Sequence, residues 1–126
     1  MKKIIECVPN FSEGKDKQKI ERIISVFGLF PEVKLVNYEA DADYNRTVVT
    51  LLGEPEVMIE AIIKMVEVCE KEIDLNNHSG EHSRMGAIDV IPFIPVDNIT
   101  IKECVEYANV LAKSISEKYN IPCFMY

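Results

Sequence analysis

The sequence has little of what marks several large classes of protein. It contains no tryptophan, only two histidines, and four cysteines that form no Cys-x-x-Cys pair. Without such a pair the chain encodes neither a zinc knuckle nor a dithiol redox motif. We expect all four thiols to be reduced and mostly buried, as free cysteines usually are: Cys7, Cys69, Cys104 and Cys123.

Positive charge is also scarce. The 14 lysines and arginines are outnumbered by 21 aspartates and glutamates, giving a formal net charge of -7. A general nucleic-acid binder needs a basic face that displaces counterions from phosphates, so this composition argues against that class. The only arginines are Arg22, Arg46 and Arg84, so an anionic ligand has to be met by a few well-placed cations.

Long apolar runs are missing too. No stretch approaches the roughly 20 residues that span a bilayer, and the lysines near the start precede no apolar signal segment. We therefore expect a cytoplasmic protein without a membrane partner. The 126 residues, 48% hydrophobic and 28% charged, have the size and composition of one globular domain.

The first quarter of the chain predicts a strand and a helix. Residues 4–8 form a short apolar run closed by Pro9 and Asn10, which is typical of a buried strand ending in a turn. A helix that ends at Gly28 follows, because apolar residues fall at the i, i+3, i+4 and i+7 positions of one face. These residues are Ile20, Ile23, Ile24 and Phe27.

The middle of the chain predicts a hairpin and a second helix. Residues 33–40 and 46–52 are rich in β-branched and apolar side chains and flank a polar connection, so we expect an antiparallel pair. Pro55 suits the first turn of a helix. The helical stripe that follows it contains Met58, Ile62, Met65 or Val66, Cys69 and Ile73.

The last part predicts a long loop, a strand, a helix and a final strand. Residues 76–86 lack apolar periodicity and form the loop, and residues 87–93 return to strand character, with Pro92 indicating an edge or a bulge. Thr100 and Glu103 have the spacing of a capping box at a helix start. Residues 121–126 are the final strand. The apolar face of the third helix is Val105, Ala108, Leu111, Ala112 and Ile115.

This order predicts an α+β fold. Its first six elements are those of a ferredoxin-like β-α-β-β-α-β sandwich, followed by an additional α-β unit, with helices on one face of a mixed sheet. The other face then needs a covering layer, because a large apolar sheet face is rarely left to water. The chain also stops at the end of a strand, so we expect a longer parent, or a homo-oligomer partner, to supply that layer.

Both histidines lie in one five-residue stretch and bracket Glu81. The imidazole, with an unperturbed pKa of about 6.5, can take and give a proton near neutrality, so His82 and His78 are candidate acid-base groups. Two solvent-facing structural histidines are the alternative. The letters also match an inverted zincin motif, but Ser79 and Gly80 disfavour the helix that this motif needs.

Two other patterns of charged residues bear on ligand binding. The acidic run 41–45 has the spacing of a calcium loop but lacks its glycine and distal glutamate, so we expect no metal there. Arg46 and Arg84 lie in polar, small-residue segments, where each can present a fork of donors to a carboxylate. Alternatively, these arginines pair on the surface with acidic neighbours. Those neighbours are Asp41, Asp43 and Glu81.

Three segments together strongly resemble glutamate formiminotransferase: residues 8–14, Val-Pro-Asn-Phe-Ser-Glu-Gly; residues 43–50, which include Asn45-Arg46-Thr47; and residues 80–96. The similarity runs along the whole chain with matching spacing. It identifies residues 1–126 as an N-terminal formiminotransferase subdomain, with a second subdomain of similar size absent. The chain departs from the family at Ser83, where proline is usual.

The resemblance implies transfer of a formimino group from formiminoglutamate to tetrahydrofolate, the co-substrate, releasing glutamate in histidine degradation. It implies that His82 is catalytic and that folate lies in a cleft between the two subdomains. Other expected substrate-binding residues are Arg46, Arg84, Asn10, Asn45, Asp43 and Glu81. A non-catalytic ferredoxin-like module that binds folate or serves assembly is the alternative.

Overall fold

The computed structural model describes residues 2–73 and 88–119, so the predicted loop 76–86 and final strand 121–126 lie outside the described residues. The described elements form an α+β fold, as predicted. In chain order they are β1 (Ile4–Cys7), β2 (Asn10–Phe11), α1 (Lys17–Ile24), the 3₁₀ helix η1 (Ser25–Leu29), β3 (Lys34–Asp41), β4 (Arg46–Gly53), α2 (Pro55–Glu72), β5 (Ile88–Val90), β6 (Phe93–Asp97) and α3 (Ile101–Tyr119).

The strands form one sheet in the order β5-β2-β4-β1-β6, with β3 on the other side of β4. The predicted hairpin of β3 and β4 is confirmed. We expected a mixed sheet, but the neighbours among the described strands are all antiparallel. The reason is that β4 lies between β1 and β3, which run in the same direction and are thereby kept apart.

Two prolines interrupt the sheet at the same level. Pro9 lies between β1 and β2, and Pro92 lies between β5 and β6. Backbone bonds connect both breaks to neighbouring strands, since Val8 N donates to Pro92 O at 3.3 Å and Val49 N donates to Pro9 O at 3.0 Å. The strand predicted over 87–93 is therefore two short strands, and it continues to Asp97 because Pro92 breaks the ladder without ending it.

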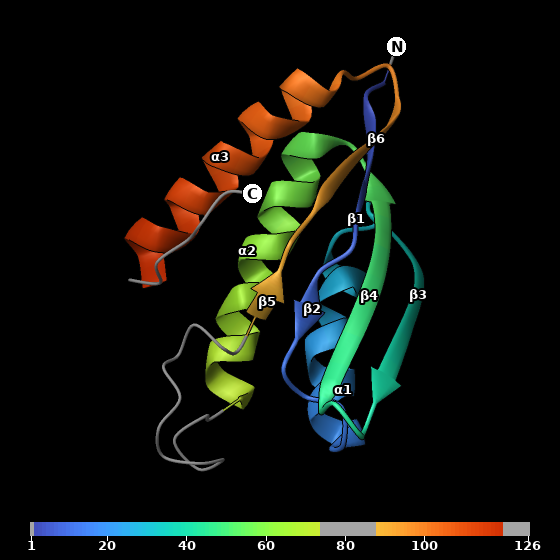
Figure 1. Ribbon diagram of the computed structural model, residues 1–126, viewed down its shortest axis with the longest axis vertical. Coiled ribbons are helices and arrows are strands. Elements are labelled where there is room, and N and C mark those ends of the chain that lie inside the picture. Colours follow the sequence, from blue (N-terminus) through green and yellow to red (C-terminus); the bar gives the residue numbers. More distant parts are fainter. Residues whose placement is uncertain (1, 74–87, 120–126) are drawn as a thin grey trace.

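The helices lie on one side of the sheet (Figure 1), as predicted, and α3 packs against α2 and β6. The central strand β4 shows the resulting alternation, because its residues Thr47, Val49 and Leu51 are fully buried under the helices while Val48 and Leu52 on the other face are only partly buried. No helix among the described residues covers this second face. Among the described residues, helices thus cover the sheet on one face only.

The predicted helix faces are largely confirmed. All four apolar residues of the first face are buried, and η1 continues α1 past the predicted end at Gly28 by one residue. The stripe of α2 is buried along its full length. The face predicted for α3 is wrong at Val105, which is 48% exposed, because the helix turns Cys104 inward instead, together with Leu111 and Ile115.

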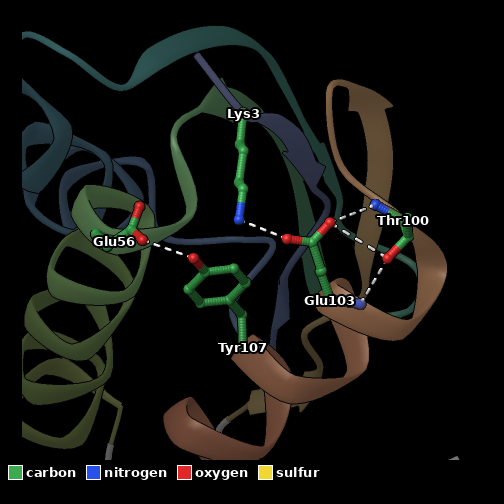
Figure 2. A network of polar contacts seen from close by, with 5 residues as sticks. All are labelled: Lys3, Glu56, Thr100, Glu103 and Tyr107. Carbon is green, nitrogen blue, oxygen red and sulfur yellow. Dashed lines mark hydrogen bonds and ion pairs between the residues drawn. The ribbon is translucent and has the colours of Figure 1, made fainter. Parts of the chain in front are cut away.

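A polar network fastens the start of α3 to the rest of the molecule (Figure 2). The predicted capping box forms, since Thr100 N donates to Glu103 Oε1 and Glu103 N donates to Thr100 Oγ1, both at 3.1 Å. Lys3 Nζ donates to Glu103 Oε2. Tyr107 Oη donates to Glu56 Oε2 at 2.6 Å, which connects α3 to the first turn of α2.

The charges in this network predict a pH dependence. The hydrogen bond from Lys3 lowers the pKa of Glu103 below its ordinary value of 4.5, and the bond to Glu103 raises the pKa of Lys3 above 10.5. Folding favours the carboxylate form of Glu103. Its contribution to the free energy of unfolding is therefore present above pH 4.5 and lost as the pH falls through the lowered pKa. The ammonium contribution is present below pH 10.5 and lost above it.

We therefore expect Glu103→Gln to lower the free energy of unfolding modestly at neutral pH, and the gap to wild type to shrink as the solution is acidified below pH 4.5. Urea unfolding at several pH values and two salt concentrations measures it, and added salt should also narrow the gap. Glu106→Gln is the control, as it removes one exposed carboxylate from the same helix. A gap that stays constant with pH would contradict this account.

Candidate functional site

The turn between β3 and β4 is built by two polar side chains. Asp41 Oδ1 accepts from the backbone N–H groups of Asp43 at 3.0 Å and Tyr44 at 3.3 Å. Asn45 has a φ of 50°, a left-handed conformation that asparagine adopts more readily than most residues. Its backbone N donates to Ala42 O at 3.3 Å. The turn therefore delivers the chain into β4 with Arg46 at a fixed place.

The loop after β2 is organised by a buried carboxylate. Glu13 is only 4% exposed, and its Oε2 accepts from the backbone N–H groups of Lys15 and Asp16, each at 3.1 Å. Asp16 then caps α1, with Oδ1 accepting from Gln18 N at 3.0 Å and Lys19 N at 3.2 Å. These bonds satisfy backbone donors that the helix start would otherwise leave unpaired.

Two side chains join this loop to the hairpin. Gly14 N donates to Asn45 Oδ1 at 2.9 Å, and the buried hydroxyl of Thr47 donates to Glu13 O. Both bonds connect residues more than 30 positions apart in the sequence. We call the group formed by Glu13, Gly14, Asn45, Arg46 and Thr47 the Arg46 corner.

Gly14 allows the two segments to approach closely. A Cβ at this position would lie 2.3 Å from Asp41 O, 2.5 Å from Arg46 N and 2.8 Å from Arg46 O. All three neighbours are backbone atoms, which cannot swing aside as the end of a flexible side chain would. A glycine is therefore required here by close packing against the start of β4.

The Arg46 guanidinium is the notable charge of the corner. Its Nε is shielded from solvent and has no hydrogen-bond partner, and its Cζ lies 5.3 Å from the centroid of the Tyr44 ring. Among residues 2–73 and 88–119 it makes no ion pair, whereas the exposed Arg22 pairs with Glu72 at 2.8 Å. The sequence alternative that Arg46 pairs with Asp41 or Asp43 is therefore wrong, because Asp41 binds the turn backbone instead, while its pairing with Glu81 stays untested because Glu81 lies outside the described residues.

Nearly the whole chain is similar to a known protein family. Residues 4–126 match the family described as the formiminotransferase domain, N-terminal subdomain. The chain belongs to this family. The resemblance drawn from the three sequence segments is thus confirmed.

Individual relatives agree. The chain is 43% identical over 126 residues to the glutamate formimidoyltransferase of Streptococcus pyogenes serotype M1. The aligned region is 100% of this chain and 42% of that protein. It is also 43% identical over its full length to the formimidoyltransferase-cyclodeaminase of Gallus gallus, of which it covers 23%. With the glutamate formimidoyltransferase of Thermoplasma acidophilum the identity is 37%, over 98% of this chain and 41% of that protein. This formiminotransferase subdomain therefore spans less than half the length of these relatives.

The corner brings together two of the three segments that carry the resemblance. Asn10 of β2 pairs with Val48 of β4. Asn45 and Arg46 lie where the hairpin contacts the loop after β2, at the hydrogen bond between Gly14 and Asn45. Asp43 is exposed in the turn. The substrate-binding roles of these four residues stay predictions.

The third segment reaches the same end of the sheet through β5. Phe11 pairs with Thr47 on one side and with Ile88, the first residue of β5, on the other. His82, Glu81 and Arg84 precede Ile88 in the sequence but lie outside the described residues, as does His78. Their predicted roles, the zincin alternative and the pairing of Arg84 therefore stay untested.

Sequence reasoning missed the inner part of the corner. Glu13, Gly14 and Thr47 lie within the segments that carry the resemblance, yet no role was predicted for them. A glycine directly after a glutamate in a polar loop is a weak signal, and the partner of each residue lies far away along the chain. Their function in the fold becomes visible only from the contacts between the two segments.

The close approach at Gly14 yields a matched pair of substitutions. Gly14→Ala should lower the free energy of unfolding by about 1–3 kcal/mol, because the added methyl group overpacks against fixed backbone. Gly28→Ala should change it little, since a Cβ there meets nothing within 4 Å. Urea denaturation of both variants measures the difference, and equal stabilities would contradict the geometry of the corner.

Proposed function

We propose that this subdomain, completed by a second formiminotransferase subdomain, transfers the formimino group of formiminoglutamate to tetrahydrofolate and releases glutamate, as a step of histidine degradation in the cytoplasm. The observation that carries the proposal is the 43% identity along the whole chain to a glutamate formimidoyltransferase. Tetrahydrofolate enters as co-substrate, and the proposed chemistry uses no metal.

His82 is the proposed catalytic residue. Attack of a folate nitrogen on the amidine carbon gives a tetrahedral intermediate, which goes forward only when the attacking nitrogen loses a proton and the glutamate nitrogen gains one. One imidazole can carry out both transfers in turn. Glu81 or Asp43 would orient the ring. The unperturbed pKa of histidine, about 6.5, suits this exchange near neutral pH.

Chain length limits how far His82 can be from the Arg46 corner. His82 precedes Ile88 by six residues in the sequence, and a fully extended connection of that length spans at most about 22 Å. Ile88 is the strand partner of Phe11, the neighbour of Thr47. The short connection supports the proposal that His82 and Arg46 contact the same bound substrate.

Arg46 and Arg84 are the proposed partners of the substrate carboxylates, on formiminoglutamate or on the folate tail. Support comes from the chain's own charge: in a protein with net charge -7, the half-buried Arg46 has a shielded Nε atom and no carboxylate partner among the described residues. A carboxylate of the substrate could accept a hydrogen bond from this guanidinium. Asn10 and Asn45 are proposed to add polar contacts to the same ligand.

The sheet topology and its uncovered face are the last part of the proposed site. We assign the elements from β1 to β6 to a ferredoxin-like split β-α-β unit, supported by the antiparallel order β3-β4-β1-β6 and the two helices on one face. The sheet face without a described helix is where a second subdomain, or another copy in an oligomer, would complete a cleft. Folate would then lie between the two layers.

Substitution of His82 tests the catalytic role. In a mixture of this chain with a separately expressed second subdomain, His82→Ala should reduce formimino transfer by about 10²–10⁴-fold, as expected for the loss of a general acid-base group. The absorbance of formimino-folate measures the rate, and His78→Ala is the neighbouring control, with activity close to wild type. Undiminished transfer in His82→Ala would refute the assignment. Folate binding without any transfer would favour the non-catalytic module.

Substitution of Arg46 tests the carboxylate contact. Arg46→Gln should raise KM for an anionic substrate about 10- to 100-fold, because a hydrogen bond to a charged group is worth about 1.5–3 kcal/mol. Arg22→Gln removes a charge of the same kind from the exposed pair with Glu72 and should leave KM unchanged. Steady-state kinetics with varied formiminoglutamate and varied folate would show which substrate is affected, and equal KM values for the two variants would exclude the proposed contact.

A further inference from the structure

The Arg46 guanidinium sits at the start of β4, and four neighbouring residues fix the backbone from which it extends. Asn45 precedes it in a left-handed conformation and accepts a hydrogen bond from Gly14 N at 2.9 Å. Thr47 follows it, fully buried, and donates to Glu13 O. The backbone on both sides of Arg46 is thus tied by side chains to the loop after β2.

These ties are specific to this place in the sheet. Thr47 is one of only two polar or charged residues that are buried among the described residues, and Glu13 is the other. A threonine hydroxyl in the core costs free energy unless it is hydrogen-bonded, and valine would fill the same volume without a polar group. The contribution of the Thr47 hydroxyl is therefore its hydrogen bond to Glu13 O, which an apolar side chain of the same size could not make.

We propose that Thr47 and Asn45 are positioning residues for a carboxylate site at Arg46: they hold the start of β4 against the loop after β2, so that the guanidinium meets a substrate carboxylate already oriented. This inference rests on the proposed function, from which it takes the ligand. Preorganisation of this kind reduces the loss of side-chain freedom on binding and so increases affinity. Tyr44, whose ring faces the guanidinium at 5.3 Å, restricts it further.

The test uses the chain itself and the Nε–H signals of its arginines in ¹⁵N-labelled protein. Only three such signals exist, from Arg22, Arg46 and Arg84, and Arg46→Lys identifies the one of interest. Titration with formiminoglutamate, and separately with glutamate, should shift the Arg46 signal and give a Kd. Thr47→Ser keeps the hydroxyl and should bind as wild type does. Thr47→Val loses the hydroxyl and should bind about tenfold more weakly, the equivalent of one hydrogen bond.

Asn45→Gly is the second variant, because glycine keeps the left-handed backbone and removes the acceptor for Gly14 N. It should also weaken binding, with the fold retained. A double-mutant cycle separates positioning from general stability. In an Arg46→Gln background, with binding followed by backbone amide shifts, Thr47→Val should cause no further loss of affinity. An equal loss in both backgrounds would overturn the proposal, since Thr47 would then act independently of Arg46.

Other outcomes are equally decisive. If no carboxylate shifts the Arg46 signal, or if Thr47→Val and Asn45→Gly bind as tightly as the unmodified chain, the positioning role is refuted. Neither result decides the proposed transfer reaction, which is measured separately through His82→Ala. Conversely, if the unmodified chain mixed with the second subdomain catalyses no transfer but still binds a carboxylate at Arg46, the proposed function is rejected and the binding site remains.

Discussion

The structure depends on the close contact between the loop after β2 and the first residues of β4. At Gly14 the two backbones approach so nearly that no side chain fits between them. This contact places β2 beside β4, and β2 in turn provides the pairing partner for β5. Three segments that are distant in the sequence therefore meet at one end of the sheet because a single position lacks a Cβ. The hydrogen bonds of Asn45 and Thr47 give this contact a defined geometry.

Electrostatics gives the same end of the sheet its chemical character. Acidic residues predominate in the chain, and several cations among the described residues pair with carboxylates, as Lys3 does with Glu103 and Arg22 with Glu72. Arg46 is different, because the acid closest to it in the hairpin, Asp41, is occupied by the turn. A protein of this charge repels anions at long range, so an anionic ligand must be held by short-range contacts of this kind.

The sequence predicted the elements well where apolar periodicity was strong, as in α2 and β4, because one face of each is buried. It failed where two apolar residues compete for the same direction. In α3 both Cys104 and Val105 fit a helical stripe, and only the position of α2 and β6 decides that Cys104 turns inward. The segments that form the candidate site were found from their composition. The hydroxyl of Thr47 was not, since its partner is 34 residues away and a strand threonine is usually unremarkable in sequence.

Prolines limit the pairing of further strands with β5 and β6. Pro92 lies between β5 and β6 and Pro95 lies within β6, so neither position offers an N–H to a strand laid alongside. At the opposite edge, β3 carries Lys34 and Glu39 and has an irregular register near Val36. Foreign strands are thus disfavoured at both borders of the sheet formed by the described strands, which opposes self-association through those edges.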